Sequence, residues 1–579
     1  MGRPASEAST PAARLAQVLA DDWAYTLKEF PEFATFVGAP GENHRWTDYS
    51  LEAIERRKQR SKQTLERLRS VDRAQLDAPG RLNYDLFGKQ VERNIEGNRF
   101  PGELMPITQL GGVQQDVAQV IAYMPAFKVE DYENILARLR GSPALIDQSI
   151  ELMERGLAEG VTPPQITLRN VPQQIKNQIV SDPIRSPLLR PFQQFSHQVS
   201  EADRERLLEE AKTAYSGRVA PAYQKLHDFF IEKYLPATRE TIAMSALPNG
   251  KAWYAHRVRY YTTTNLSPQQ IHKIGLGEVK RIRAEMERVR KEAGFEGSWD
   301  EFNEYLRTDP QFFYTEKKDL LIGYRDVAKR ADAELVKLFG SLPRLPYGVV
   351  PVPSYAEKSQ TTAYYLPGSA AGGRPGQFFA NTYNLEARPT WEMEALTLHE
   401  AVPGHHLQIA LAQELEGLPE FRKHTRFTAF VEGWGLYAES LGEEMGFYAD
   451  PYSKFGQLNY EMWRAIRLVV DTGMHALGWS RQQAIDFFTE NTGRAEHDIT
   501  VEVDRYIVWP GQALAYKIGE LKIKELRAFA RQELGENFDI RAFHDQVLGA
   551  GALPLDLLES RIKNWVVEQK KQAAASGTS

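Results

Sequence analysis

The sequence His399-Glu400-Ala401-Val402-Pro403-Gly404-His405-His406 gathers three of the chain's 12 histidines into one short segment, beside a glutamate. Neutral imidazole and carboxylate are the usual ligands of a catalytic zinc ion that keeps one position open. Such an ion lowers the pKa of a bound water to about 7, and an adjacent carboxylate can accept its proton. The segment therefore predicts a zinc site with His399 as a ligand and Glu400 as the general base. The alternative is a Pro-Gly helix break with incidental histidines.

The spacing of these histidines does not fit an unbroken helix. Pro403 stands where the usual His-Glu-x-x-His motif would have its second histidine. On a regular helix His405 lies about 240° round from His399, and His406 lies ~10 Å further along the axis. Proline prevents the regular hydrogen bond, and glycine permits unusual backbone angles. We expect a kink or bulge at Pro403 and Gly404 that brings His405 to the metal, with His406 as the alternative ligand.

The third ligand is expected from another segment. Residues 427–441 read as an apolar helix that includes Glu432 and Glu439. A carboxylate in such a helix is costly unless it is paired or binds a metal. Gly433 and Gly435 would let this helix approach a neighbour closely. Either glutamate is a candidate ligand, and a solvated face that carries both is the alternative.

The remainder of the chain predicts a mainly α fold. Segments with helical periodicity are residues 51–70, 131–156, 201–234, 268–293, 317–339 and 513–534. Residues 342–389 have short β-type runs instead, which predict one small antiparallel sheet just before the histidine segment. Residues 160–192 contain many prolines and predict a long loop or lid.

Length and composition limit the class of protein. A chain of 579 residues is expected to form at least two subdomains. Its net charge of −6 arises from intermixed acidic and basic residues, which argues against a nucleic-acid surface. There is no cysteine, so disulfides and thiolate ligands are excluded. No apolar run approaches the ~18 residues of a membrane span.

We expect four parts along the chain. These are a disordered leader (1–20), an N-terminal helical lobe (21–240) with the proline-rich loop, a catalytic helical lobe (241–570) and a disordered tail (571–579). No apolar segment of the secretory type precedes the first helical pattern. The protein would then be periplasmic or secreted if a leader was removed, and otherwise cytoplasmic. The oligomeric state is left open, with a homodimer as one option.

Three motifs together resemble the bacterial family known as domain of unknown function 885. They are the histidine segment, the run Glu-Gly-Trp-Gly-Leu-Tyr-Ala-Glu-Ser at 432–440, and Arg505-Tyr506 followed by Pro-Gly-Gln-Ala-Leu-Ala-Tyr-Lys-Ile-Gly at 510–519. The resemblance extends over most of the chain. The family is similar to the gluzincin metallopeptidases, such as thimet oligopeptidase, angiotensin-converting enzyme and carboxypeptidase Taq. It implies a two-lobed helical fold with a deep cleft, one Zn2+ per chain, and hydrolysis of peptide bonds in small peptides.

The same resemblance assigns roles to individual residues. His399 and Glu400 match the start of the gluzincin motif, His405 matches its closing histidine after a longer spacing, and Glu432 matches the downstream ligand. In those peptidases a downstream tyrosine commonly stabilises the oxyanion. The candidates here are Tyr506 and Tyr516, with two structural tyrosines as the alternative.

Several residues around this centre are candidates for substrate binding. Residues 377–383 are expected to be an edge strand that binds an extended peptide, with Asn381 and Tyr383 as contacts. Gln512 shares a helical face with Tyr516. Arg464 and Arg467 lie on one predicted helix, where an arginine could bind a substrate carboxylate. A structural ion-pair network is the alternative for the arginines.

The predicted function is therefore a zinc metallopeptidase of carboxypeptidase, dipeptidase or oligopeptidase type. One alternative is a zinc hydrolase that cleaves a non-peptide amide with the same site. Another is a non-catalytic peptide-binding relative, which would be marked by a missing ligand or a missing general base. Neither is missing from this sequence.

Overall fold

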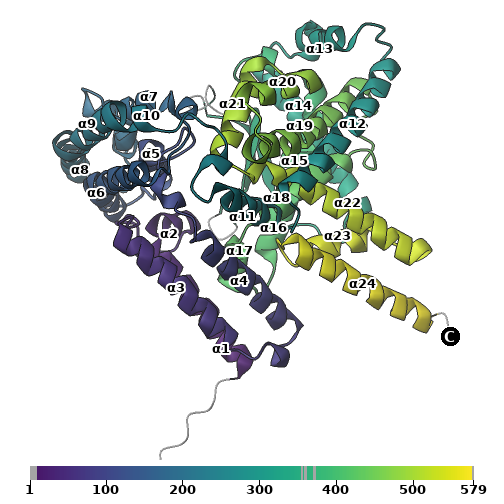
Figure 1. Ribbon diagram of the computed structural model, residues 1–579, viewed down its shortest axis with the longest axis horizontal. Coiled ribbons are helices and arrows are strands. Elements are labelled where there is room, and N and C mark those ends of the chain that lie inside the picture. Colours follow the sequence, from purple (N-terminus) through teal and green to yellow (C-terminus); the bar gives the residue numbers. More distant parts are fainter. Residues whose placement is uncertain (1–9, 354–356, 358–360, 370–372, 577–579) are drawn as a thin grey trace, which may run out of the picture. The chain divides into compact units, whose positions relative to one another are not determined.

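The computed structural model describes residues 10–353, 357, 361–369 and 373–576 (Figure 1). The chain forms two compact units, Met1–Trp253 and Tyr254–Ser579. The boundary falls within helix α11 (Gly250–Thr262), slightly after the expected boundary at residue 240. No helix in the part of the chain described here has both the length and the apolar character needed to cross a membrane.

Unit 1 is helical. Its helices before α11 are α1 (Pro11–Glu29), α2 (Pro31–Val37), α3 (Leu51–Arg69), α4 (Ala78–Gly97), α5 (Val113–Tyr123), α6 (Val129–Glu159), α7 (Val171–Lys176), α8 (Glu201–Ala214), α9 (Ala220–Phe229) and α10 (Leu235–Ala237). Thr10 caps α1 by accepting a hydrogen bond from the Ala13 amide, and Pro11 occupies the first helical position. The disordered leader expected for residues 1–20 is therefore wrong for residues 11–20, which are helical.

The proline-rich segment of unit 1 differs from the expected lid. It forms α7 and three 3₁₀ helices, Gln165–Leu168, Pro183–Arg185 and Pro187–Gln193. Pro172, Pro183 and Pro187 lie in first turns, where a missing amide hydrogen removes no helical hydrogen bond. Leu168 and Phe192 are buried in the core of this unit. The segment therefore packs within unit 1 and is not a lid, because the apolar residues between its prolines are buried in the core.

Unit 2 is built around one long helix, α19 (Pro451–Ala476), which is buried along most of its length. Helix α12 (Pro268–Glu292) packs along α19, and α18 (Thr428–Ser440) packs along α22 (Ala515–Leu534) (Figure 1). The other helices are α13 (Trp299–Thr308), α14 (Lys317–Leu338), α15 (Met393–Glu400), α16 (His405–Glu414), α17 (Glu420–His424), α20 (Arg481–Asn491), α21 (Glu496–Val508), α23 (Ile540–Leu548) and α24 (Leu555–Ser576). Helix α24 covers residues 571–576, so the expected disordered tail is wrong there.

A small sheet lies in unit 2, as expected, but it is mixed. Its strands are β1 (Tyr347–Pro351), β2 (Ala363–Leu366) and β3 (Gly376–Ala380), in the order β1-β3-β2. Strand β3 pairs antiparallel with β2 and parallel with β1. The predictions of a wholly antiparallel sheet and of an edge strand at 377–383 are both wrong. Strand β2 pairs with the strand that follows it, and β1 takes the other side of β3.

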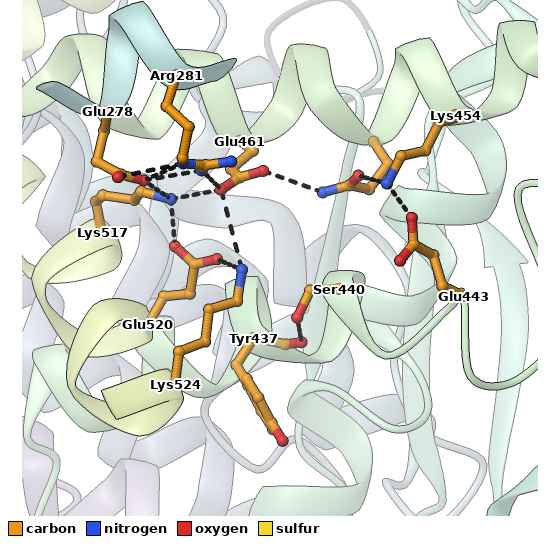
Figure 2. Close-up of polar contacts among 11 residues, drawn as sticks. Glu278, Arg281, Tyr437, Ser440, Glu443, Lys454, Glu461, Lys517, Glu520 and Lys524 are labelled. Atoms are coloured by element: carbon orange, nitrogen blue, oxygen red, sulfur yellow. Dashed lines mark hydrogen bonds and ion pairs between the residues drawn. The ribbon is translucent and has the colours of Figure 1, made fainter. Parts of the chain in front are cut away.

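A buried ion network joins α12, α19 and α22 (Figure 2). The Lys517 ammonium lies 2.6 Å from Glu461 Oε1, 2.6 Å from Glu520 Oε2 and 3.0 Å from Glu278 Oε2. Lys517 is fully buried and follows Tyr516 directly, at the start of α22. The network therefore anchors the end of α22 that carries a candidate site residue.

Candidate metal centre

The histidine segment is a turn between two helices. Helix α15 ends at Glu400 and α16 begins at His405, so the expected kink is a complete interruption. The Val402–Pro403 peptide bond is cis, and the Pro403 carbonyl accepts a 2.8 Å hydrogen bond from Trp434 Nε1 of α18. A Cβ on Gly404 would overlap the carbonyls of Leu398 and His399, so this position requires glycine. The turn places His399 and His405 side by side.

Three donor atoms from three helices converge at this turn. Glu432 Oε2 of α18 lies 3.8 Å from His399 Nε2 and 3.6 Å from His405 Nε2. The donor atoms of this group all lie within 4.8 Å of one another. Donors around a tetrahedral zinc ion lie roughly 3.3 Å apart, so one ion fits among them with little movement. The structure thus brings together the three residues that the sequence predicted as ligands.

Glu439 holds the other side of the His399 ring. Its Oε1 lies 2.7 Å from His399 Nδ1, and both side chains are buried. Glu439 is thus placed to accept the Nδ1 proton, so that Nε2 is the atom that would bind a metal after losing its own proton, as in carboxylate–histidine–metal arrangements. Glu439 was predicted as an alternative ligand, but it lies behind His399. His405 Nδ1 is buried and forms no hydrogen bond within the described residues.

Gly435 makes room for the His399 ring. A Cβ at this position of α18 would lie 2.7 Å from His399 Cε1 and 2.8 Å from Nε2. These distances are well inside van der Waals contact, so any larger residue would displace the imidazole. The close approach that the sequence predicted at this glycine is therefore made by the His399 side chain.

The charges of the group favour a bound cation. Burial alone would lower the pKa of His399, but Glu432 and Glu439 outweigh it and raise the pKa to about 9. Burial would likewise raise the pKa of Glu432, yet the two histidines hold it well below its usual value. Glu400, the last residue of α15, adds a third negative charge beside His399. Three carboxylates thus surround two imidazoles, which suits a divalent metal.

His406 points away from this group. Its Nδ1 lies 2.8 Å from the Tyr365 hydroxyl of β2, and its ring lies 4.5 Å from the ring of Tyr347 in β1. Burial lowers the pKa of His406 to about 4, which keeps the ring neutral. His406 therefore attaches α16 to the sheet, while His405 faces the other donors.

The two candidate tyrosines differ in their surroundings. The Tyr506 hydroxyl lies 2.6 Å from Glu502 Oε2, 2.9 Å from Arg467 Nε and 3.0 Å from Trp463 Nε1, so its hydrogen bonds are satisfied. Burial raises the pKa of Tyr516, and the charge of Glu432 raises it further. Of the two tyrosines, Tyr516 is therefore the one on which a residue of the metal-binding group acts.

Most of the predicted substrate contacts are used elsewhere. Asn381 is fully buried and donates hydrogen bonds to the carbonyls of Glu357 and Thr361. Gln512 is buried and accepts a 2.8 Å hydrogen bond from Arg505 Nη1. Tyr383 is 39% exposed. The structure does not bring these three residues into the histidine–glutamate group.

A cluster of buried and half-buried arginines lies on and around α19. It contains Arg464 and Arg467, which the sequence singled out, and also Arg494 and Arg505, which it did not. Glu502 pairs with Arg467 at 3.3 Å and with Arg505 at 3.1 Å. Glu502 and Arg505 lie one turn apart on α21, whereas Arg467 lies on α19, so local spacing could not have revealed the link between Glu502 and Arg467.

Comparisons with known proteins agree on fold and family. The model of the family described as "Bacterial protein of unknown function (DUF885)" matches residues 31–562. A solved protein of Colwellia psychrerythraea, described as a lipoprotein, is 28% identical with a TM-score of 0.92, over 97% of this chain and 100% of that one. A second, from Shewanella oneidensis and also described as a lipoprotein of unknown function, is 15% identical with a TM-score of 0.69, over 96% and 99%. No curated protein matches.

Proposed function

The chain belongs to this bacterial family of unknown function, and from that premise we propose that it is a zinc-dependent peptidase. The observation that carries the proposal is the group His399, His405 and Glu432, with donor atoms within 4.8 Å of one another. Two imidazoles and one carboxylate are the ligand set of many catalytic zinc sites, in which a fourth position stays open. The buried Glu439 behind His399 adds the outer carboxylate that such sites use.

The residues around the group suit hydrolysis of an amide bond. Zinc, when bound, would polarise the scissile carbonyl and acidify a water molecule. Glu400, which follows the ligand His399, would accept the proton of the attacking water and deliver it to the leaving amine. Tyr516 would donate a hydrogen bond to the carbonyl oxygen as negative charge develops on it. Tyr506, whose hydroxyl is already saturated, would instead position Arg467.

Peptides are the substrate class that we favour. The sequence motifs resemble those of gluzincin peptidases, and the deep cleft of those enzymes remains a prediction for this chain. The Colwellia relative is described as a lipoprotein. This favours the periplasmic option among the expected locations, where small peptides are available to a hydrolase.

Replacing Glu400 tests the mechanism. Glu400→Gln keeps the size of the side chain but removes the base, so kcat should fall by about 1,000-fold. Zinc content, measured on the purified protein, should stay at one ion per chain. The control is Glu443→Gln, which changes an exposed carboxylate that pairs with Lys454. Full activity of a zinc-loaded Glu400→Gln protein would exclude the mechanism.

The choice of substrates separates the peptidase from the amide hydrolase. Zinc-loaded protein would be assayed with unmodified peptides and with acylated amino acids under the same conditions. We expect cleavage of the peptides. Cleavage of acylated amino acids alone would favour the non-peptide amide hydrolase, and zinc-dependent peptide binding without turnover would favour the non-catalytic relative.

A further inference from the structure

Arg464 is a buried arginine that lacks a carboxylate partner. It lies on α19 and is 6% exposed. Its Nη1 makes a long hydrogen bond of 3.4 Å to the Tyr460 carbonyl, and its Nε makes none. Within the described residues Arg464 forms no ion pair, whereas other buried cations of this unit, such as Lys517, do. A buried charge without a counter-ion is costly, so an anionic ligand is the simplest reason to keep one there.

Arg467, one turn along the same helix, also has a buried donor without a hydrogen-bond partner. Its Nη1 is buried without a hydrogen bond, although its Nη2 lies 3.3 Å from Glu502. Glu502 also serves Arg505, at 3.1 Å. Arg467 and Arg505 therefore share one carboxylate, and Arg464 has none, so these three arginines keep an excess of positive charge.

Two observations link the two arginines to the proposed metal centre. The Arg467 guanidinium carbon lies 4.4 Å from the ring centre of Tyr516, whose hydroxyl is influenced by Glu432. Glu439, the carboxylate that holds His399, is the acidic group that acts most strongly on Arg464. The rings of Tyr460 and Trp463 lie 4.7 Å and 4.8 Å from the Arg464 guanidinium carbon and hold it in one orientation.

We propose that Arg464 and Arg467 bind the C-terminal carboxylate of the peptide substrate, so that this peptidase removes residues from the C-terminal end. The inference rests on the proposed function. A carboxylate is planar and accepts paired hydrogen bonds from guanidinium groups, which matches the donors that lack partners. Every unmodified peptide carries one such group at its end. A structural ion network explains Arg505, but it leaves Arg464 unexplained.

Modified peptides test this directly. Zinc-loaded wild-type protein would be assayed with a short alanine peptide as the free acid, as its C-terminal amide and as its N-acetyl derivative. Because the amide leaves the buried guanidinium groups unpaired, kcat/KM should fall by about 100-fold. N-acetylation should have little effect. Arg464→Met should reduce cleavage of the free acid to the level of the amide, and Arg464→Lys should restore part of the difference.

Binding and stability give readouts that do not depend on turnover. In the Glu400→Gln background, calorimetry should show that the free acid binds about 100-fold more tightly than the amide, and Arg464→Met should remove this preference. Arg464→Met should also raise the thermal midpoint, because it removes a buried charge that has no partner. The matched control is Arg481→Met, since Arg481 pairs with Asp504 at 2.6 Å. That variant should lower the midpoint and keep the preference for the acid.

The outcomes distinguish this inference from the function on which it rests. Equal cleavage of acid and amide would overturn the carboxylate subsite and leave the peptidase standing. Binding of the acid through Arg464 without any cleavage would overturn the peptidase and support the subsite. If an amidated peptide with a penultimate glutamate were cleaved as well as the free acid, the arginines would recognise a side chain, and the C-terminal assignment would be wrong. A lower thermal midpoint for Arg464→Met, with the acid preference intact, would show a purely structural role.

Discussion

At the scale of single residues, the partner of Nδ1 in His399 and in His406 determines whether the ring can bind a metal. Glu439 is hydrogen-bonded to Nδ1 of His399, so Nε2 is the nitrogen that could bind a metal. In His406 the Tyr365 hydroxyl occupies Nδ1, and the ring lies against Tyr347. Two adjacent histidines, His405 and His406, therefore have different roles because they leave α16 in different directions.

Replacing each of these two histidines by alanine should distinguish the residue that binds metal from the residue that packs against the sheet. His405→Ala removes one of three donors, so the purified protein should lose its stoichiometric zinc. His406→Ala removes a buried ring and its hydrogen bond, which should cost about 2 kcal/mol of unfolding free energy. Its zinc content should stay at one ion per chain. Elemental analysis and thermal melting of both variants check this, and retained zinc in His405→Ala would contradict the ligand assignment.

At the scale of elements, the centre depends on how closely α18 approaches its neighbours. Gly435 allows contact with His399, and Gly433 packs against Gly519 of α22, where added Cβ atoms would meet backbone. Gly404 allows the turn between α15 and α16. Glycine lowers helix stability, but at each of these positions a side chain would overlap a neighbouring group.

Gly435→Ala should damage the centre more than the fold. The added carbon would lie 2.7 Å from His399 Cε1 and push the ring from its place. Zinc affinity should fall by about 10-fold or more, as it does when support for a ligand is lost. The control is Gly277→Ala in α12, where an added carbon meets nothing within 4 Å. Competition with a chelator measures both, and an unchanged affinity for Gly435→Ala would contradict the packing argument.

His544 makes the packing of α23 sensitive to acid. Its Nε2 lies 2.8 Å from the Tyr437 hydroxyl of α18, and its Nδ1 lies 2.8 Å from the Leu338 carbonyl at the end of α14. Burial lowers the pKa of His544 to about 3. Below about pH 6.5 the unfolded chain binds a proton that the folded chain excludes, so stability falls as pH falls.

Urea unfolding at pH 4.5 to 7.5 should reveal this contribution. For His544 alone the unfolding free energy should decline by up to about 1.4 kcal/mol per pH unit below pH 6.5. His544→Asn should be less stable at pH 7.5 but should have a flatter pH dependence. Phe543→Leu, beside it in α23, should shift the curve downward without changing its slope. An identical slope for His544→Asn and wild type would contradict the assignment.

At the scale of the whole molecule, α19 is the element that links the ion network of unit 2 to the arginines of the proposed carboxylate subsite. Its buried face carries Glu461 in the ion network and Arg464 and Arg467 in the arginine cluster. A helix buried on most sides is usually apolar throughout. In the ion network Arg281 and Lys524 join Lys517 and balance the three carboxylates (Figure 2). The arginine cluster is not balanced in this way, so the two have different roles.

Replacing Lys517 should therefore strongly lower the stability of unit 2. Lys517→Met leaves Glu461 and Glu520 buried with weaker compensation, and the unfolding free energy should drop by about 3–5 kcal/mol. The control is Lys563→Met, because the ion pair of Lys563 with Glu559 lies at the surface and should contribute less than about 1 kcal/mol. Denaturant unfolding compares the two. A loss below about 1 kcal/mol for Lys517→Met would show that the network contributes little.

Much of this protein followed from short-range patterns in the chain. Periodicity anticipated α3, α6, α12 and α14, because a helix forms between residues within one turn. The histidine segment and the Glu432 run anticipated the donor group, since proline and glycine in succession disfavour a regular helix.

The errors and omissions concern long-range partners. The order of the sheet, the packed proline segment, the position of Glu439 behind His399 and the unpaired Arg464 all depend on groups far apart in the chain. A side chain's role is set by the charge, hydrogen bonds and burial that its neighbours provide, and these neighbours meet only after folding. Local sequence therefore identified which residues form the donor group, while folding placed one histidine in that group, packed its neighbour against the sheet, and left Arg464 without a counter-ion.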